Sequence, residues 1–272
     1  MWNRDTKDPL ARLFLDKYGV HLLARPREKV AVYDVFPVAD TRAATPGSLE
    51  GFVGAQLVLP KVTAGEELVD VSGTVSDSVS GKIGFDFLSG FLAAIGVQAL
   101  INKLSAILGG AQARALCFRF SGASRDSADP FALERSLRKY HCSPEDLLMK
   151  EGYRYFVAVA VHRTDKLSFT ALDTKSSEIN LSAEVAGLGT ANIQTSTGRS
   201  RELTIQGDVP MAYGVELSQL VYNYRRSRLE LAMTKGYIKT MAVPTVELPG
   251  RARSMIGGAH DSMVLNLGDD SI

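Results

Sequence analysis

The sequence predicts an α+β fold in which several helices surround a twisted, mostly antiparallel sheet. Three features carry this prediction: a helix opens the chain, a helix-rich stretch interrupts the strands in the middle, and alternating apolar and polar residues fill much of the second half. With 272 residues, 45% of them hydrophobic, the chain can bury a sizeable core without a disulfide or a metal ion.

The first predicted element is an amphipathic helix of about ten residues. Asp8 can cap its N-terminus, Pro9 suits the first helical position, and Gly19 ends it. Between these limits, apolar residues recur at helical spacing from Leu10 to Tyr18. The apolar face of this helix therefore needs a surface to pack on.

Basic residues lie on this helix and directly after it. Arg12 and Lys17 belong to its polar face, and Arg25, Arg27 and Lys29 form a basic run soon afterwards. These cations form either a solvated surface or a contact for anionic lipid, and the pattern leaves both interpretations open. The candidate lipid contacts are Arg12, Lys17, Arg25 and Arg27.

Short strands are predicted next, at Val30–Val35 and Gly54–Val58, with a turn-rich stretch from Ala43 to Ser48 between them. From Leu68 to Gly84, small polar residues are mixed with single valines. A strand of this composition packs poorly on a core, so we expect a mobile edge strand there.

The middle of the chain carries the signals of further helices. Asp129-Pro130 precedes one helix, in which Glu134 and Arg138 are four residues apart on one face. Ser143-Pro144-Glu145-Asp146 resembles a capping box and predicts another. Phe87–Asn102 contains no charged residue but is shorter than the about 20 residues of a spanning helix, which favours a buried helix or a helix followed by a strand.

The second half is predicted to consist mainly of strands. Tyr153–Val161 is an apolar run typical of a buried strand, and Met211–Leu217 places every second residue on one apolar face. Tyr222–Gly236 fits a strand or a helix equally well. Between the two strands lie three alternating segments, whose apolar members are Leu167, Phe169, Ala171, Ile179, Leu181, Ala183, Val185, Ala191 and Ile193.

Alternation of this kind suits two environments. It is typical of a water-exposed sheet with one covered face, and equally of a membrane-spanning strand, which needs about 9 to 11 residues with one apolar side. The pattern alone does not separate these two interpretations.

Charge and composition limit the functional classes. The 31 basic and 30 acidic residues nearly cancel, which predicts no affinity for nucleic acid. Two cysteines without metal-binding spacing favour a reducing compartment. Because the N-terminus lacks the apolar run of a signal peptide, we expect a cytoplasmic protein that is not secreted.

No catalytic or cofactor motif has the required spacing. Gly187–Asn192 begins like a dinucleotide loop but lacks the third glycine. His260-Asp261-Ser262 are consecutive, and His141 adjoins Cys142, whereas catalytic groups must converge from separate elements. The sequence therefore predicts no catalytic residue, no metal site and no cofactor, and we expect a protein that is not an enzyme.

Two stretches resemble bacterial gasdermins. The first runs from Asp8-Pro9-Leu10 through Leu22–Glu28 and is similar to the opening helix of that family and to the Leu-x-x-Pro-Arg start of its first strand. The second runs from Gly189–Ile193 through Leu203–Val215 and is similar to a late strand that contains Pro-x-Ala-Tyr. The likeness covers roughly residues 5 to 248.

The resemblance implies a pore-forming domain at residues 1–248 and an autoinhibitory C-terminal tail at residues 249–272. It implies that an activating protease removes the tail and that the freed domains form a ring of β-hairpins in the inner membrane. The partners would be this protease, anionic membrane lipid and other copies of the chain in a large ring. The pore would kill the infected cell as an anti-phage response.

The tail has features that suit this role. Arg251 and Arg253 lie in a flexible basic stretch and are the candidate cleavage positions. The segment after Arg253 carries three of the 30 acidic residues and none of the 31 basic ones, so its removal raises the net charge from +1 to +4. Beyond it, Val264, Leu265 and Leu267 could lie along an edge strand and inhibit; the alternative is a disordered tail.

One departure concerns lipid modification. Many bacterial gasdermins carry a cysteine within the first few residues that accepts a palmitoyl chain, whereas Trp2 and Asn3 stand there in this sequence. No lipidation site is therefore predicted. The alternative to a pore former is a soluble sheet-based binding or interaction protein without membrane activity.

Overall fold

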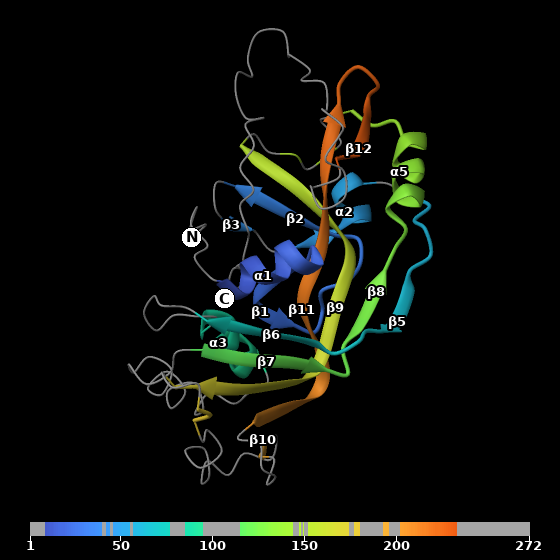
Figure 1. Ribbon diagram of the computed structural model, residues 1–272. Helices are drawn as coiled ribbons and strands as arrows, with labels where there is room; N and C mark the ends of the chain where they lie inside the picture. The colour runs from blue at the N-terminus through green and yellow to red at the C-terminus, as the bar shows by residue number, and fades with distance from the viewer. Residues whose placement is uncertain are drawn as a thin grey trace.

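The computed structural model describes residues 9–39, 42–43, 46–54, 57–76, 85–94, 115–143, 147, 149, 152–173, 177–179, 193–195 and 202–232. These residues form one twelve-stranded sheet, and each named strand pair in it is antiparallel. Helices pack around the sheet, as Figure 1 shows. The α+β architecture predicted from the sequence is therefore confirmed.

Two long strands run the height of the molecule and organise the sheet (Figure 1). They are β9, Tyr153–Leu172, and β11, Leu203–Asn223, and they pair from Leu203 opposite Phe169 to Leu220 opposite Tyr155. The apolar run and the first alternating segment, which the sequence presents separately, are thus one continuous strand.

Different strands flank the two ends of this pair. The upper half comprises Tyr153–Val161 of β9 and Leu217–Asn223 of β11, and the lower half comprises Thr164–Leu172 and Leu203–Met211. The upper half is flanked by β2 (Asp34–Ala39), with the short β3 (Arg42–Ala43) and β4 (Gly47–Ser48), and by β12 (Arg228–Ala232). The lower half is flanked by β7 (Ala115–Ser121), β6 (Val71–Ser76) and β10 (Ile193–Thr195). At mid-height β1 (His21–Arg27) pairs with β11, while β8 (Ser124–Ser127) pairs with β9 and with β5 (Thr63–Glu67).

Two of the predicted helices are confirmed. Helix α1 spans Pro9–Tyr18 and ends at Gly19, whose φ of 69° is the left-handed conformation that glycine adopts without strain. Helix α5 spans Pro130–Lys139, and Oδ1 of Asp129 accepts a hydrogen bond of 2.9 Å from the N–H of Phe131. Local capping chemistry therefore sets the start of α5, whereas the predicted cap of α1, Asp8, lies outside the described residues.

The two short strands predicted in the first half are not found with the predicted bounds. Residues 28–33 are turns and irregular chain, and β2 begins only at Asp34, whose carboxylate accepts a hydrogen bond of 2.9 Å from the N–H of Ala31. In the second predicted strand, Gly54 ends helix α2, Leu49–Val53, Leu57 and Val58 are irregular, and residues 55–56 lie outside the described part. The hydroxyl of Ser48 caps α2, and Gly54 ends it in the left-handed conformation.

Other predictions are met in part. The uncharged segment begins with a helix, α3, Phe85–Ala94, and its remainder lies outside the described residues. Leu147 and Met149, which follow the proposed capping box, are not helical, and residues 144–146 lie outside the described part. In Tyr222–Gly236, for which the sequence left strand and helix open, β11 continues to Asn223 and a turn leads into β12. Among the described residues, the helices are too short or too polar to cross a membrane.

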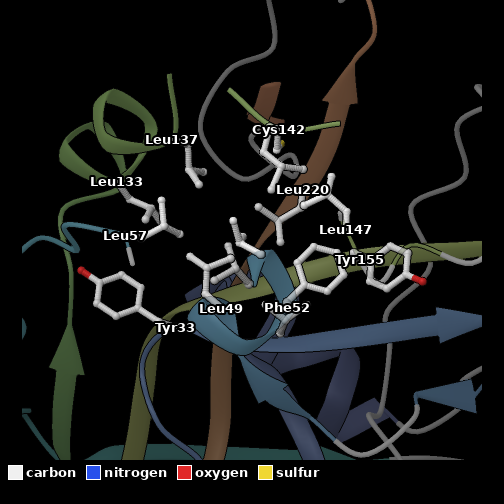
Figure 2. Close-up of a cluster of buried hydrophobic side chains, with 14 of the residues drawn as sticks. Tyr33, Leu49, Phe52, Leu57, Leu133, Leu137, Cys142, Leu147, Tyr155 and Leu220 are labelled. Carbon is white, nitrogen blue, oxygen red and sulfur yellow. The ribbon is translucent and has the colours of Figure 1, made fainter. Parts of the chain in front are cut away.

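Buried side chains form three clusters. The upper core lies between α2, α5 and the upper half of the sheet, and Figure 2 shows Leu49, Phe52, Leu133, Tyr155 and Leu220 converging there. The lower core joins α1, α3 and β1 to the lower half. A third cluster, which we call the rear core, packs Leu23 of β1, Val30 of the connection and Phe36 of β2 on residues of β9 and β11.

The last predicted strand does not keep one apolar face. Tyr213 belongs to the lower core, whereas Val215 and Leu217 belong to the rear core together with Ala212. The register of β11 against β9 shifts between Ala212 and Gly214 and again between Glu216 and Leu217. The first bulge adds Tyr213 to β11 and so turns the following side chains of β11 to the other face, whereas the second adds Val159 to β9.

Candidate functional site

Helix α1 is docked on the lower half through one aromatic side chain. Phe14 is 1% exposed, and its ring centroid lies 5.7 Å from Phe118, 5.5 Å from Phe120 and 6.2 Å from Tyr213. The rings meet in tilted and edge-to-face arrangements, which aromatic pairs prefer. The amphipathic helix therefore covers apolar surface on β7 and β11.

The candidate inserting residues of β9 lie under this helix. Leu167 and Phe169 are each 2% exposed, Ala171 is fully buried, and all three belong to the lower core. Polar residues alternate with them: the hydroxyl of Ser168 lies 2.8 Å from that of Thr204 on β11. This part of β9 thus has one apolar face and one polar face.

The other candidate inserting residues are only partly described. Ile179 is half-buried against the lower core, and its N–H donates to the carbonyl of Ala171 over 2.8 Å. Ile193 lies in β10, opposite Ile205 of β11. The remaining candidates lie outside the described residues and are Leu181, Ala183, Val185 and Ala191.

The candidate lipid contacts lie on two elements that the fold brings together, since α1 packs against β1. Arg12 and Lys17 are in α1, and Lys17 is exposed with its ammonium 5.0 Å from the ring centroid of Tyr18. Arg25 is exposed and Arg27 half-buried in β1. Four basic residues distant by up to 15 positions in sequence thus belong to one pair of packed elements.

A row of charged side chains crosses the sheet at mid-height and was missed by the sequence analysis. Arg125 on β8 donates two hydrogen bonds to Glu216 on β11, over 2.9 and 3.1 Å, and lies 3.4 Å from Glu66 on β5. His162 on β9 lies 2.9 Å from the same Glu216 carboxylate. We refer to Glu66, Arg125, His162 and Glu216 as the charged row.

The charged row sets the ionisation of its central carboxylate. Burial alone would raise the pKa of Glu216, but the hydrogen bonds from His162 and Arg125 outweigh burial and hold this pKa below its ordinary value. Glu216 is therefore ionised at neutral pH and remains matched to the guanidinium of Arg125.

A second set of polar contacts lies on the opposite face of the same strands, because successive residues of a strand point to opposite sides. Arg163 donates to Asp126 over 3.1 Å and to the carbonyl oxygens of Glu28, over 2.8 Å, and Val30. These bonds attach the connection between β1 and β2 to β9. The mid-height strands are therefore held by charges on both faces.

Tyr213 lies between the docked helix and the charged row, with its ring centroid 6.2 Å from that of Phe14 and 6.0 Å from that of His162. Its ring is fully buried and stacked on Phe120, with centroids 4.5 Å apart, and its hydroxyl has no hydrogen-bond partner among the described residues. Burial raises the pKa of this hydroxyl above its ordinary value, and Tyr18 adds to that effect. Leaving a buried hydroxyl without a partner costs stability.

The described residues contain no group of three or more side chains suited to a metal ion. The candidate cleavage residues Arg251 and Arg253, and the tail residues Val264, Leu265 and Leu267, lie outside the described part of the chain. What the structure does present is a strand pair with alternating faces beneath a docked amphipathic helix, and beside it a row of charges.

Comparison with known proteins identifies the relatives of this arrangement. Residues 20–235 match the model of the Bacterial Gasdermin Family. The chain is 22% identical over 222 residues to the gasdermin bGSDM of Vitiosangium sp. (strain GDMCC 1.1324), covering 78% of this chain and 81% of that protein. Its fold is similar to the structure of a bacterial gasdermin from Bradyrhizobium tropiciagri, with a TM-score of 0.60, 15% identity and coverage of 85% and 93%.

Proposed function

This chain belongs to the bacterial gasdermin family, a family of pore-forming proteins, and on that basis we propose that it is a latent pore former activated when a protease removes its C-terminal tail. The proposal divides the chain into a pore-forming domain at residues 1–248 and an autoinhibitory tail at residues 249–272. Arg251 and Arg253 are the proposed cleavage positions.

The observation that carries this proposal is the lower half of the sheet. A spanning strand needs about 9 to 11 residues with one apolar and one polar face. Thr164–Leu172 of β9 and Leu203–Met211 of β11 approach this length, and the apolar face of β9 bears Leu167, Phe169 and Ala171. In the latent state α1 and α3 cover this face, and in the pore lipid would take their place.

Charge supports the membrane step. Anionic lipid attracts basic residues near its surface by about 1 kcal/mol for each one. Lys17 on α1 and Arg25 on β1 are exposed, and removal of the segment after Arg253 raises the net charge of the remaining chain from +1 to +4. Cleavage would therefore strengthen binding to an anionic bilayer as well as release the domain.

The complete sequence of events is part of the proposal. The latent chain is cytoplasmic, and the cut domains bind the inner membrane, oligomerise with one another and insert β-hairpins that close into a barrel. A closed barrel satisfies every backbone hydrogen bond within the membrane. The resulting pore kills the infected cell in anti-phage defence, and no catalytic activity is involved.

The test is dye leakage from vesicles that contain anionic lipid. A recognition sequence for a site-specific protease is placed between Arg253 and Ser254, so that the same full-length preparation is compared before and after cutting. We expect release of the dye only after cutting, and less release from vesicles of neutral lipid. Negligible leakage in all samples would contradict the proposal and favour a sheet-based binding protein without membrane activity.

A further inference from the structure

The charged row coincides with a discontinuity in the sheet. Ala160–Arg163 of β9, which include His162 of the row, pair with β8, whereas Lys166–Leu172 pair with β7, so β9 changes its partner strand directly below the row. On the other side of β9, the register against β11 shifts at three places between Gln206 and Leu217. The regular ladders of the two halves are therefore interrupted at the height of the row.

Packing changes at the same height. Along β9, Val159 is in the upper core and Leu167 is in the lower core, with His162 between them. The two cores have no residue in common. Helix α1 contributes only to the lower core, and α2 and α5 only to the upper core. A displacement of α1 and α3 would thus disturb the lower core without removing a side chain from the upper core.

The row also clamps strands that are not neighbours. Arg125 on β8 reaches across β9 to Glu216 on β11, and it approaches Glu66 on β5, so one guanidinium links three strands. The side chains of Arg125 and Glu216 are 30% and 28% exposed, and a two-pronged bond between them is directional. On the opposite face, Arg163 and Asp126 join β9 to β8.

We propose that the charged row is a fixed boundary, which confines the membrane-associated rearrangement of β9 and β11 to the lower half. This inference rests on the proposed pore-forming function. The clamp resists separation of β8 from the β9–β11 pair, since parting Arg125 from Glu216 breaks the two-pronged bond between two half-buried charges. Charged side chains on the lipid face of a spanning strand are also strongly disfavoured, so the row stays at or outside the membrane surface.

Hydrogen–deuterium exchange tests the position of the boundary. The full-length chain with the inserted protease site is cut, bound to anionic vesicles and compared with the uncut chain in solution. We expect exchange to change in Thr164–Leu172 and Leu203–Met211, and to stay the same in Tyr153–Val161 and Leu217–Asn223. A change that continues through the upper half in the wild-type protein overturns the inference.

Two variants test whether the charged row determines the position of this boundary. In Arg125→Met the clamp is lost, and in the double variant R125M/E216Q it is lost without leaving the half-buried charge of Glu216 unmatched, which protects the test against simple misfolding. In both, exchange of Ala160–Arg163 on the membrane should rise about tenfold, because local opening there is no longer opposed. The matched control is Arg138→Met, which breaks the exposed pair of Arg138 and Glu134 on α5, 2.8 Å apart, and should behave like the wild type.

The possible failures are distinguishable. If the cut wild-type chain permeabilises vesicles but the double variant shows wild-type exchange at Ala160–Arg163, the boundary does not depend on the charged row and the inference is wrong. If the cut wild-type chain neither binds nor permeabilises vesicles, the proposed function is wrong and the inference falls with it.

Discussion

The two ends of the β9–β11 pair differ in how the polar groups around them are hydrogen-bonded. In the upper half, polar groups at the margins are satisfied: the hydroxyl of Tyr222 donates to the carbonyl of Cys142 over 2.7 Å, and the N–H of Leu231 donates to the carboxylate of Glu134 on α5. In the lower core, the fully buried hydroxyl of Tyr213, two residues beyond the lower half of β11, has no partner among the described residues.

The two halves also differ in the kind of contact that holds them, directional hydrogen bonds in one and apolar packing in the other. The upper half satisfies its edge strand with a helix carboxylate, which also blocks that edge against other strands. The lower half depends on apolar contacts with α1 and α3, which lipid could replace because those contacts are not directional. Under the proposed function, a single sheet would thus combine an anchored half with a half that accepts a second environment.

The largest expected effect comes from Phe14→Ala, which removes the ring that docks α1. Truncating a buried phenylalanine costs about 3 to 5 kcal/mol, so we expect a clear fall in the free energy of unfolding in urea. Hydrogen exchange should increase in the lower half and remain near wild type in the upper half.

Phe52→Ala is the matched control for this prediction. Phe52 lies in the upper core with its ring 4.9 Å from that of Tyr155, and its truncation should raise exchange in the upper half alone. If both variants raised exchange equally in both halves, the cores would not be independent and the comparison between the halves would fail.

The next effect concerns Glu216 and depends on pH. Its pKa in the folded protein lies below the ordinary 4.5, so the ionised carboxylate contributes stability that is present above about pH 4.5 and is lost as the pH falls through the folded pKa. Glu216→Gln should therefore lower the free energy of unfolding by about 2 kcal/mol at pH 7. The difference from the wild type should shrink in acid, as measured by urea denaturation at a series of pH values.

A difference between Glu216→Gln and wild type that stayed constant from pH 7 to about pH 3 would show that the charge of Glu216 is not what stabilises the fold. Glu230→Gln is a useful comparison. The pKa of Glu230 is also lowered, because bonds from Asn223 and Arg228 outweigh its burial, but these partners lie close in the same hairpin and clamp no distant strand.

A smaller effect of opposite sign is expected for Tyr213→Phe. Removing a buried hydroxyl without a partner while keeping the stacked ring should stabilise the latent fold by about 1 kcal/mol, seen as a higher melting temperature. The substitution would remove the unpartnered hydroxyl from the lower core and so test whether this group is what distinguishes it from the upper half. A lower melting temperature would reveal that the hydroxyl does make a stabilising bond.

Sequence reasoning succeeded where the decisive interactions are local. Helices α1 and α5 were predicted because the residues that favour their ends are neighbours in sequence. The lower half of β9 was predicted because apolar and polar residues alternate along it, as they do in a strand with one buried face. The charged row could not be found in this way. Arg125 is 59 residues from Glu66 and 91 from Glu216, and only the pairing of β5, β8, β9 and β11 brings them together.

Local chemistry also explains two of the errors. Helix α2 escaped detection because Ser48, its cap, lies at the end of a stretch rich in turn residues, where a serine has several possible roles. The predicted single face of β11 failed because the bulge between Ala212 and Gly214 resets the alternation, and no pattern in the residues themselves marks a bulge.

The smallest expected effect lies at the start of α5, in the upper half. Asp129→Ala removes the side chain that caps the N–H of Phe131 and should cost about 1 kcal/mol in urea denaturation. Asp129→Asn retains a capping oxygen and should cost less, whereas the exposed pair of Asp129 and Arg135, 4.0 Å apart, should contribute little in either case. Because α5 touches only the upper core, neither substitution should alter exchange in the lower half or leakage after cutting, and a change in either would contradict the division of the sheet at the charged row.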